Sequence, residues 1–264
     1  MKFVVCVKLT PDTEQLAAVK PETVGKGDLG VTMVLNPWDE YAVEEALQLA
    51  ERYDGDTIAL TMGGAESVEA LKRAVAMGIG ETVFLCDDAF TDSDAWGTSY
   101  VLAAAIKKQG DPTLVLTGKM SVDGNSGAVG PGLAAQLGFP YISNVVKIEE
   151  VTATSATVRR MLDEGMQTVK VALPAVLSVS IEINEPRYPN FMGIRKASRL
   201  QYPAVTADDL GIDKSKVGKA GAHVRWTNLR KPPARGGSCD FVAGDTTADK
   251  ARTLADKLIA DKVL

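Results

Sequence analysis

Histidine is almost absent from this chain of 264 residues, which contains only His223. A zinc site of three histidines, or of two cysteines and two histidines, therefore cannot be assembled from it. A serine or cysteine triad would need His223 as its base, and this residue lies in a polar stretch that is typical of a protein surface. We therefore predict no catalytic residue and no metal-binding residue in this chain.

Cysteines and long apolar runs are also scarce. Cys6, Cys86 and Cys239 are far apart and form no CxxC pair, which argues against zinc, an iron–sulfur cluster or a disulfide framework. Such cysteine usage is typical of a reducing compartment. No apolar run reaches the roughly 18 residues that a membrane-spanning helix needs, and the apolar run at the N-terminus is too short for a secretory signal. We expect a cytoplasmic protein without stable membrane insertion.

Neither sign of charge dominates the composition. The chain has 29 Lys and Arg against 34 Asp and Glu, which gives a net charge of −5. Proteins that bind nucleic acid usually carry a basic patch, so nucleic acid is not an expected partner. The length suits one large domain, or one domain with an extension.

The sequence does contain a regular alternation of short β-rich runs with helical patterns. This alternation predicts an α/β fold with a doubly wound, mostly parallel sheet. Ligands of such a sheet bind beyond the carboxyl ends of the strands, which here carry Lys8, Thr61-Met62-Gly63-Gly64 and Thr117-Gly118-Lys119. The predicted strands cover residues 3–8, 57–61, 82–86 and 113–117, and the predicted helices cover 39–53, 66–77 and 95–109.

The pattern changes after Pro140. Three β-rich runs over 142–148, 157–162 and 168–171 predict an antiparallel extension of the sheet. Residues 214–244 are rich in Gly, Pro, Lys and Arg, and residues 249–264 have apolar side chains at helical spacing. This last part is either a disordered linker or an arm that wraps a partner subunit, with the final helix docking on it.

The densest motif is a glycine-rich stretch over residues 118–133. It follows a predicted strand, leads into a helical pattern and contains five glycines. Glycines allow a backbone to approach a phosphate closely, and the start of a helix offers free N–H groups. The stretch is not a Walker A loop, because no Gly-Lys-Ser/Thr closes it, and it is not GxGxxG in the first βα turn. A purely structural turn is the alternative.

Two further segments are candidates for binding. Asn36-Pro37-Trp38-Asp39 begins a predicted helix with Asp39 as a cap, and its backbone and Asn36 are placed to border an adenine or a ribose. Residues 184–196 put Phe191, Met192 and Ile194 in a turn-rich, basic setting. Such apolar side chains either pack locally or, when exposed, anchor a protein partner.

Together these segments resemble the β subunit of electron transfer flavoproteins. The resemblance implies an adenine nucleotide alpha hydrolase-like α/β domain over residues 1–200. It also implies an extended arm and terminal helix over 201–264 that contact an α subunit. The matching residues follow the family's order along nearly the whole chain: Val5-Cys6-Val7-Lys8, Asn36-Pro37-Trp38-Asp39-Glu40-Tyr41-Ala42-Val43-Glu44-Glu45-Ala46, Ala74-Val75-Ala76-Met77-Gly78, Gly118-Lys119, the glycine-rich loop and Asn184-Glu185-Pro186-Arg187-Tyr188.

The family forms a heterodimer whose α subunit carries a redox FAD, while the β subunit binds a second adenine nucleotide. In the ordinary type this nucleotide is a structural AMP. In the electron-bifurcating type it is a second FAD that accepts electrons from NADH. The resemblance thus implies electron transfer between NADH or acyl-CoA-type dehydrogenases and other acceptors. By position it assigns nucleotide binding to Cys6, Asn36, Pro37, Trp38, Asp39, Met62, Asp123, Gly124, Asn125, Ser126, Gly127, Ala128, Val129, Gly130 and Pro131.

The glycine-rich loop decides which type is expected. The bifurcating pattern, Asp-Gly-Asp-Thr-Ala-Gln-Val-Gly-Pro, is matched at Asp123-Gly124 and Val129-Gly130-Pro131. Asn125-Ser126 replace Asp-Thr, and Gly127-Ala128 replace Ala-Gln. The ordinary pattern matches less well. We therefore favour FAD over AMP in this subunit, with the ordinary, AMP-binding type as the alternative.

The stretch from Pro189 to Lys196 resembles the family's recognition loop, which docks flavin-dependent acyl-CoA dehydrogenases. Phe191 stands where the family has a leucine anchor, and the implied docking residues are Phe191, Met192, Ile194 and Lys196. A stand-alone nucleotide-binding protein of the universal-stress type is a rival, although it does not predict the arm. An ATP pyrophosphatase would need a Ser- and Gly-rich loop after the first strand, where this chain has Leu9-Thr10-Pro11.

Overall fold

The computed structural model describes residues 1–24, 29–231, 233, 236 and 239–263. Contacts divide the chain into two units, Met1–Leu229 and Arg230–Leu264. The predicted division after residue 200 falls within the first unit, because residues 201–229 pack with it. Residues 232, 234–235 and 237–238 of the predicted arm, and Leu264 of the predicted last helix, lie outside the described residues.

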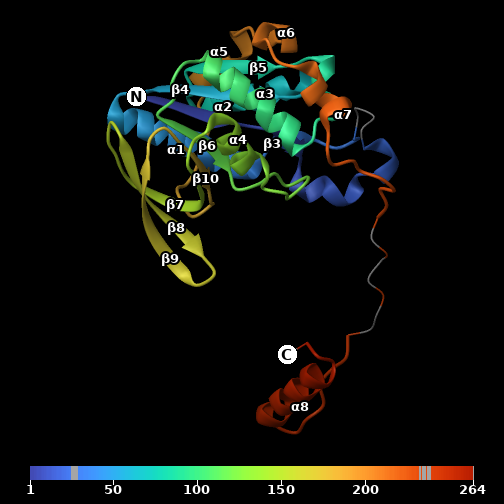
Figure 1. The fold of residues 1–264 in the computed structure, drawn as a ribbon. Helices are drawn as coiled ribbons and strands as arrows, with labels where there is room; N and C mark the ends of the chain where they lie inside the picture. Colours follow the sequence, from blue (N-terminus) through green and yellow to red (C-terminus); the bar gives the residue numbers. More distant parts are fainter. Residues whose placement is uncertain (25–28, 232, 234–235, 237–238, 264) are drawn as a thin grey trace. The chain divides into compact units, whose positions relative to one another are not determined.

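Within the described residues, a nine-stranded sheet forms the centre of the first unit (Figure 1). Neighbouring strands are parallel from β11 to β7. Strand β8 is antiparallel to both of its neighbours, β7 and β9. This confirms the predicted α/β fold with its antiparallel extension. In spatial order the strands are β11 (Ala204–Val205), β5 (Glu81–Leu85), β4 (Asp56–Met62), β1 (Lys2–Cys6), β6 (Leu114–Gly118), β10 (Ala175–Val179), β7 (Tyr141–Val151), β8 (Ser155–Leu162) and β9 (Gly165–Ala172).

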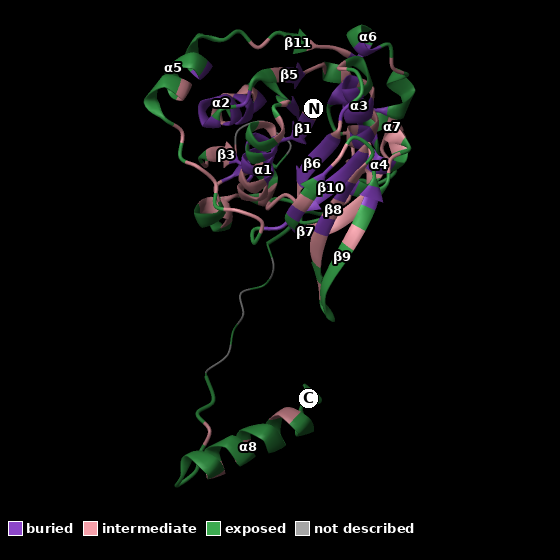
Figure 2. Ribbon diagram, turned by 90° about the vertical axis from the view of Figure 1, so that its left-hand side faces the viewer, coloured by how far each residue is buried: buried purple, intermediate pink, exposed green. Residues whose placement is uncertain are grey.

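Helices cover both faces of the sheet, with the buried strands between them (Figure 2). The helices α1 (Pro37–Tyr53) and α2 (Val68–Met77) pack on the face that carries Phe3 and Val5 of β1. The helices α3 (Ala95–Lys108) and α4 (Val129–Leu137) pack on the opposite face, which carries Val4 and Cys6. The continuous apolar run at the start of the sequence follows from this arrangement, because both faces of a central parallel strand are buried. Each fully buried Val or Phe side chain of β1 contributes about 1.5–3 kcal/mol to the free energy of folding.

Short elements complete the first unit. The strands β2 (Leu9–Pro11) and β3 (Met33–Leu35) form a separate antiparallel pair after β1. The 3-10 helices are η1 (Thr13–Ala18), η2 (Pro21–Thr23), η3 (Ala65–Ser67), η4 (Asp88–Phe90) and η5 (Lys214–Lys216), and the shortest α-helices are α6 (Ala207–Leu210) and α7 (Gly218–Gly221).

One element differs from the sequence prediction. The segment after residue 184 was expected to be turn-rich, but it contains the helix α5 (Phe191–Arg199). The side chain of Asn190 caps this helix by accepting the Gly193 N–H at 2.7 Å. Only Ala197 of α5 is buried. The helical period was not recognised because most of the apolar side chains face solvent instead of forming a buried stripe.

The second unit contains the helix α8 (Thr247–Ala260). The Thr246 side chain accepts the Asp249 N–H, and the Asp249 carboxylate accepts the Thr246 N–H, so the helix begins with a capping box. No residue of α8 is buried. Among the described residues, no helix is both long enough and apolar enough to span a membrane.

Candidate functional site

The predicted binding residues gather at the carboxyl ends of three adjacent strands, β4, β1 and β6. Cys6 ends β1 and pairs in register with Leu60 of β4 and Thr117 of β6. Met62 ends β4, and Gly118 ends β6. The helices α1 and α4 begin here, so two helix N-termini and three strand ends meet in one place. Such a meeting of strand ends is where doubly wound folds bind ligands.

Asn36 fastens the glycine-rich loop to the end of β1. Its side chain is buried, and its Nδ2 donates to the Met120 carbonyl at 2.9 Å. Its Oδ1 accepts the Val122 N–H at 3.2 Å, and its own N–H donates to the Lys8 carbonyl at 2.8 Å. The side chain therefore shapes the loop that follows β6, which is a role distinct from capping α1.

Asp39 is a buried carboxyl group in the first turn of α1. Its Oδ2 accepts the Lys8 N–H at 2.9 Å, and it also accepts a hydrogen bond from the Gly118 backbone. Burial raises the pKa of Asp39 to about 7, although hydrogen bonds from Asn36, Lys8 and Gly118 act in the opposite direction. A methyl group at Gly118 would lie 2.5 Å from Asp39 Oδ1 and 2.7 Å from the Trp38 carbonyl carbon. Glycine at 118 is therefore what allows α1 to approach β6 so closely.

Cys6 lies beside this carboxyl group. Burial, and after it the charge of Asp39, raises the pKa of the Cys6 thiol to about 12. The thiol is therefore neutral at physiological pH and is not a nucleophile.

The loop from Asp123 to Ala128 is held above the strand ends by a small number of contacts. Lys8 Nζ lies 2.6 Å from Asp123 Oδ2. Burial raises the pKa of Asp123, but the ammonium of Lys8 outweighs it, and the net shift is downward. Asn125 and Gly127 have φ angles of 50° and 58°, in the left-handed region that glycine and asparagine tolerate best. The loop thus turns sharply and then enters α4.

The N-terminus of α4 lacks a side-chain cap. Ala128 occupies the cap position and accepts no hydrogen bond from the helix through a side chain, so the first N–H groups of α4 are available to an anion. Gly130, in the first turn, packs closely on β6 and β7. A methyl group there would lie 3.2 Å from the Tyr141 hydroxyl and 3.3 Å from Thr117 Oγ1.

Two buried hydroxyl groups lie at the same strand ends, on Thr61 and Thr117, which belong to the predicted ligand loops but were not assigned individually as binding residues. Within the described part of the chain, neither Thr61 Oγ1 nor Thr117 Oγ1 has a hydrogen-bond partner. Each precedes a residue that was singled out, Met62 or Gly118. Buried hydroxyl groups are normally paired, so an unpaired one indicates a missing partner such as a ligand or water. Lys119, from the predicted ligand loop after β6, lies near the start of α1, with its Nζ 5.8 Å from the centre of the Trp38 ring.

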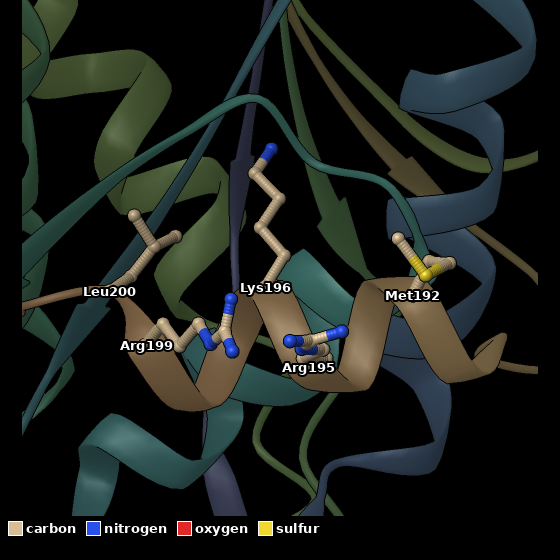
Figure 3. A pocket seen from close by; sticks show the side chains of 5 residues that line it. All are labelled: Met192, Arg195, Lys196, Arg199 and Leu200. Carbon is tan, nitrogen blue, oxygen red and sulfur yellow. The ribbon is translucent and has the colours of Figure 1, made fainter.

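The predicted docking residues lie elsewhere, on α5. Phe191 and Met192 are 76% and 68% exposed, and Ile194 is also exposed. Together with Arg195 and Arg199 they give α5 an apolar and basic outer surface. Figure 3 shows Met192, Arg195, Lys196 and Arg199 along this helix. Within the described residues, Arg195, Lys196 and Arg199 form no ion pair.

His223 is exposed, and its backbone N–H donates to the carboxylate of Asp94 at 2.7 Å. In the part of the chain that the structure describes, no three His, Cys, Asp or Glu side chains are grouped so as to hold a metal ion.

The fold and these strand ends define a doubly wound α/β protein with a glycine-rich loop between β6 and α4. Residues 28–210 match the electron transfer flavoprotein domain. The chain belongs to the electron transfer flavoprotein family, and its relatives place it among the β subunits.

Three relatives illustrate the likeness. The caffeyl-CoA reductase–Etf complex subunit CarD of Acetobacterium woodii is 34% identical over 261 residues, covering 98% of both chains. The electron transfer flavoprotein subunit beta of Clostridium acetobutylicum is 37% identical over 225 residues, covering 84% of this chain and 85% of that protein. The protein FixA of Azorhizobium caulinodans is 34% identical over 268 residues, covering 99% of this chain and 93% of that protein.

Proposed function

We propose that this chain binds an adenine nucleotide, FAD in preference to AMP, at the ends of β4, β1 and β6. The unpaired buried hydroxyl group of Thr117 is the observation that carries the proposal, because it lies beside Gly130 in the first turn of α4, where a doubly wound fold receives its ligand. Thr61, on the face of the sheet that α1 and α2 cover, is a second unpaired hydroxyl group at these strand ends. The uncapped N-terminus of α4 adds N–H donors for phosphate. This set of hydroxyl and amide donors fits a nucleotide.

In this proposal the chain performs no acid–base catalysis. The Asn125 N–H already donates to the Ser121 carbonyl at 2.8 Å and the Ala128 N–H to Ser126 Oγ at 3.4 Å, so the N–H groups of Ser126, Gly127 and the first turn of α4 hold the phosphates. Asn36 and Asp39 fix the loop and the start of α1, on which the adenine end rests. A bound flavin would supply the redox chemistry, and the protein would orient it and tune its potential. The preference for FAD rests on the match at Asp123-Gly124 and Val129-Gly130-Pro131.

The proposal includes two protein partners. The chain pairs with an α subunit that carries a further FAD, and the second unit, with its unburied helix α8, supplies much of the contact. A flavin-dependent dehydrogenase docks on Phe191, Met192, Ile194 and Lys196 of α5. A relative named as a subunit of a caffeyl-CoA reductase–Etf complex supports a partner of this kind. We place the heterodimer in the cytoplasm, passing electrons between NADH or an acyl-CoA-type dehydrogenase and another acceptor.

The nucleotide content of the purified heterodimer tests the proposal. The chain is co-expressed with the α subunit from its genome neighbourhood, and FAD and AMP are released by denaturation and quantified. We expect about two FAD per heterodimer, one in each subunit. One FAD and one AMP per heterodimer would indicate the ordinary, AMP-binding type instead of the bifurcating type. A flavin-free homodimer without a partner would overturn the assignment in favour of a stand-alone nucleotide-binding protein.

Thr117→Val tests the site itself, because it removes the hydroxyl group and keeps the shape of the side chain. Loss of one hydrogen bond to the nucleotide costs about 1 kcal/mol, so we expect about fivefold weaker nucleotide binding. Thr168→Val on β9 is the matched control and should bind normally, since it lies on an exposed part of the antiparallel extension. Equal binding by both variants would remove Thr117 from the site.

A further inference from the structure

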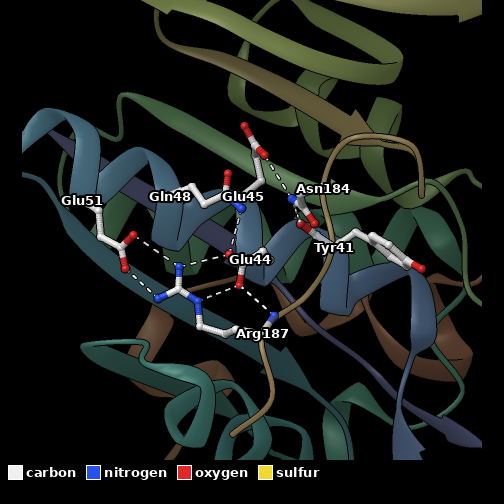
Figure 4. Close-up of polar contacts among 7 residues, drawn as sticks. All are labelled: Tyr41, Glu44, Glu45, Gln48, Glu51, Asn184 and Arg187. Atoms are coloured by element: carbon white, nitrogen blue, oxygen red, sulfur yellow. Dashed lines mark hydrogen bonds and ion pairs between the residues drawn. The ribbon is translucent and has the colours of Figure 1, made fainter.

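The chain between β10 and α5 crosses α1 without forming a helix or strand of its own from residue 184 to 190. Arg187 fastens it there (Figure 4). The guanidinium Nε lies 2.8 Å from Glu44 Oε2, and Nη1 lies 2.6 Å from Glu51 Oε1. The Arg187 backbone N–H also donates to Glu44 Oε2 at 3.1 Å. One arginine therefore connects this segment to two carboxylates of a single helix.

Glu44 is the buried half of this ion pair, with a side chain that is 4% exposed. Burial raises the pKa of Glu44, but the hydrogen bonds from Arg187 and Gln48 outweigh it, and the net pKa is lowered. A buried carboxylate that loses its arginine is left uncompensated, which is strongly unfavourable. Arg187 is therefore held against α1 by an ion pair with a buried carboxylate, which is costlier to break than an ion pair at the surface.

A second contact lies beside the first. Asn184 Nδ2 donates to the Tyr41 carbonyl at 3.1 Å and to Glu45 Oε2 at 3.0 Å. Glu44, Gln48 and Glu51 follow one face of α1, at spacings of four and seven residues that bring side chains together on a helix. The connecting segment is thus held on α1 by ion pairs and by hydrogen bonds that each involve a side chain.

The same helix begins at the proposed nucleotide site. Asn36 and Asp39 lie at the N-terminus of α1, and Arg187 binds further along it. Phe191, the exposed docking anchor, follows Arg187 after three intervening residues. Beyond it, α5 rests on α2 through Gly193 and Ala197.

We propose that Arg187 is a positioning residue: its bond to α1 fixes the start of the docking helix α5 relative to the nucleotide site. The inference rests on the proposed docking role of α5. Without Arg187, the segment before α5 would move, and the apolar anchors would no longer be presented to the partner in one arrangement. Electron transfer depends on that arrangement because it sets how the partner approaches the bound nucleotide.

Hydrogen exchange on the heterodimer tests the role of Arg187 without a dehydrogenase being present. In Arg187→Gln we expect amides 188–194 to exchange about tenfold faster, while amides of β1, β4 and α2 and the nucleotide content stay unchanged. Arg187→Lys keeps one of the two carboxylate contacts and should give an intermediate rate. Arg52→Gln is the matched control, an arginine of α1 that donates to the Glu149 carbonyl at 3.0 Å. It should leave 188–194 unchanged.

A kinetic measurement separates positioning from simple structural support. With butyryl-CoA dehydrogenase as the probe, we expect Arg187→Gln to raise KM for the dehydrogenase more than it lowers kcat, with partial rescue in Arg187→Lys. Unchanged exchange in 188–194, or faster exchange throughout the sheet, would overturn the inference. If the unsubstituted heterodimer does not react with the dehydrogenase, the proposed docking role fails. The exchange result still decides whether Arg187 orders the segment.

Discussion

Asp39 shows how a single buried residue connects the elements of the site. Its carboxyl group joins the first turn of α1 to the backbone at Lys8 and at Gly118, and these belong to segments far apart in the sequence. The same burial that makes it a good connector makes its ionisation costly. Its effect on stability must therefore depend on pH.

The sign of this dependence follows from the raised pKa. The folded protein holds the Asp39 proton up to a pKa of about 7, whereas the unfolded chain releases it near 3.8. The stabilising contribution of the protonated form is complete below the unfolded pKa and is lost as the pH rises towards 7. The free energy of unfolding should fall by about 1.4 kcal/mol per pH unit in this window because of Asp39.

Urea unfolding at pH 5, 6, 7 and 8 checks this, with Asp39→Asn as the comparison. The variant keeps one acceptor oxygen and cannot ionise. We expect the stability of the unsubstituted chain to fall relative to the variant up to pH 7 and then to level off. A difference that is the same at every pH would mean that Asp39 titrates normally.

Gly118 gives a second prediction at the same scale. Gly118→Ala places a methyl group against Asp39 Oδ1 and the Trp38 backbone, neither of which can move without shifting α1. We expect a loss of about 1–3 kcal/mol in the free energy of unfolding, as is usual for overpacking. Gly124→Ala is the control, because the nearest atom to its methyl group would be Ser121 Oγ at 3.9 Å. Equal stability of the two variants, measured by urea unfolding, would contradict this reading of the contact between α1 and β6.

At the scale of elements, the helix α5 has one side that packs on α2 and another side that faces outward. Gly193 and Ala197 face α2, and an added methyl group at Gly193 would meet the Ala76 carbonyl. The residues that point outward are apolar and basic. Because the outward side chains are exposed, we expect that they can be changed without unfolding the chain.

Phe191→Ala uses this separation. The side chain is 76% exposed, so the melting temperature and the bound nucleotide should be unchanged, because surface changes away from special contacts have small effects on stability. Electron transfer with a dehydrogenase should be slower. Met166→Ala, an exposed methionine of β9, is the control and should transfer electrons at the normal rate. Loss of nucleotide from Phe191→Ala would show that this part of α5 is structural.

At the scale of the whole molecule, the chain consists of a sheet domain and a separate second unit. The division lies at Arg230, and the helix α8 that follows has no buried residue. Its apolar side chains, including Leu254 and Ile259, are exposed in the chain by itself. An amphipathic helix of this kind needs a partner surface to bury its apolar side.

Truncation after Leu229 tests the role of the second unit. We expect the melting temperature of the truncated chain to match that of the full chain, while the heterodimer with the α subunit no longer forms. Leu254→Asp in the full chain should weaken the heterodimer in the same direction, since it charges the apolar side of α8. If both variants assemble normally in size-exclusion chromatography, the second unit does not bind the α subunit and is a linker.

The sequence by itself determined the fold class and the strand ends at which the proposed binding residues lie. Apolar periodicity produces this result, because parallel strands must be apolar on both faces and the covering helices on one. The glycine-rich loop was recognisable because close backbone approach requires glycine. The exposed helix α5 was missed, because its apolar residues face outward and the usual buried stripe is absent.

Only the tertiary structure decided which side chains meet. The ion pairs of Lys8 with Asp123 and of Arg187 with Glu44 and Glu51 join residues that are far apart in the sequence. No periodicity encodes such pairs, since they depend on how the right-handed crossovers bring distant segments to one edge of the sheet. The residues of the proposed site could be predicted from the sequence, whereas their geometry depends on how the sheet packs between its helices.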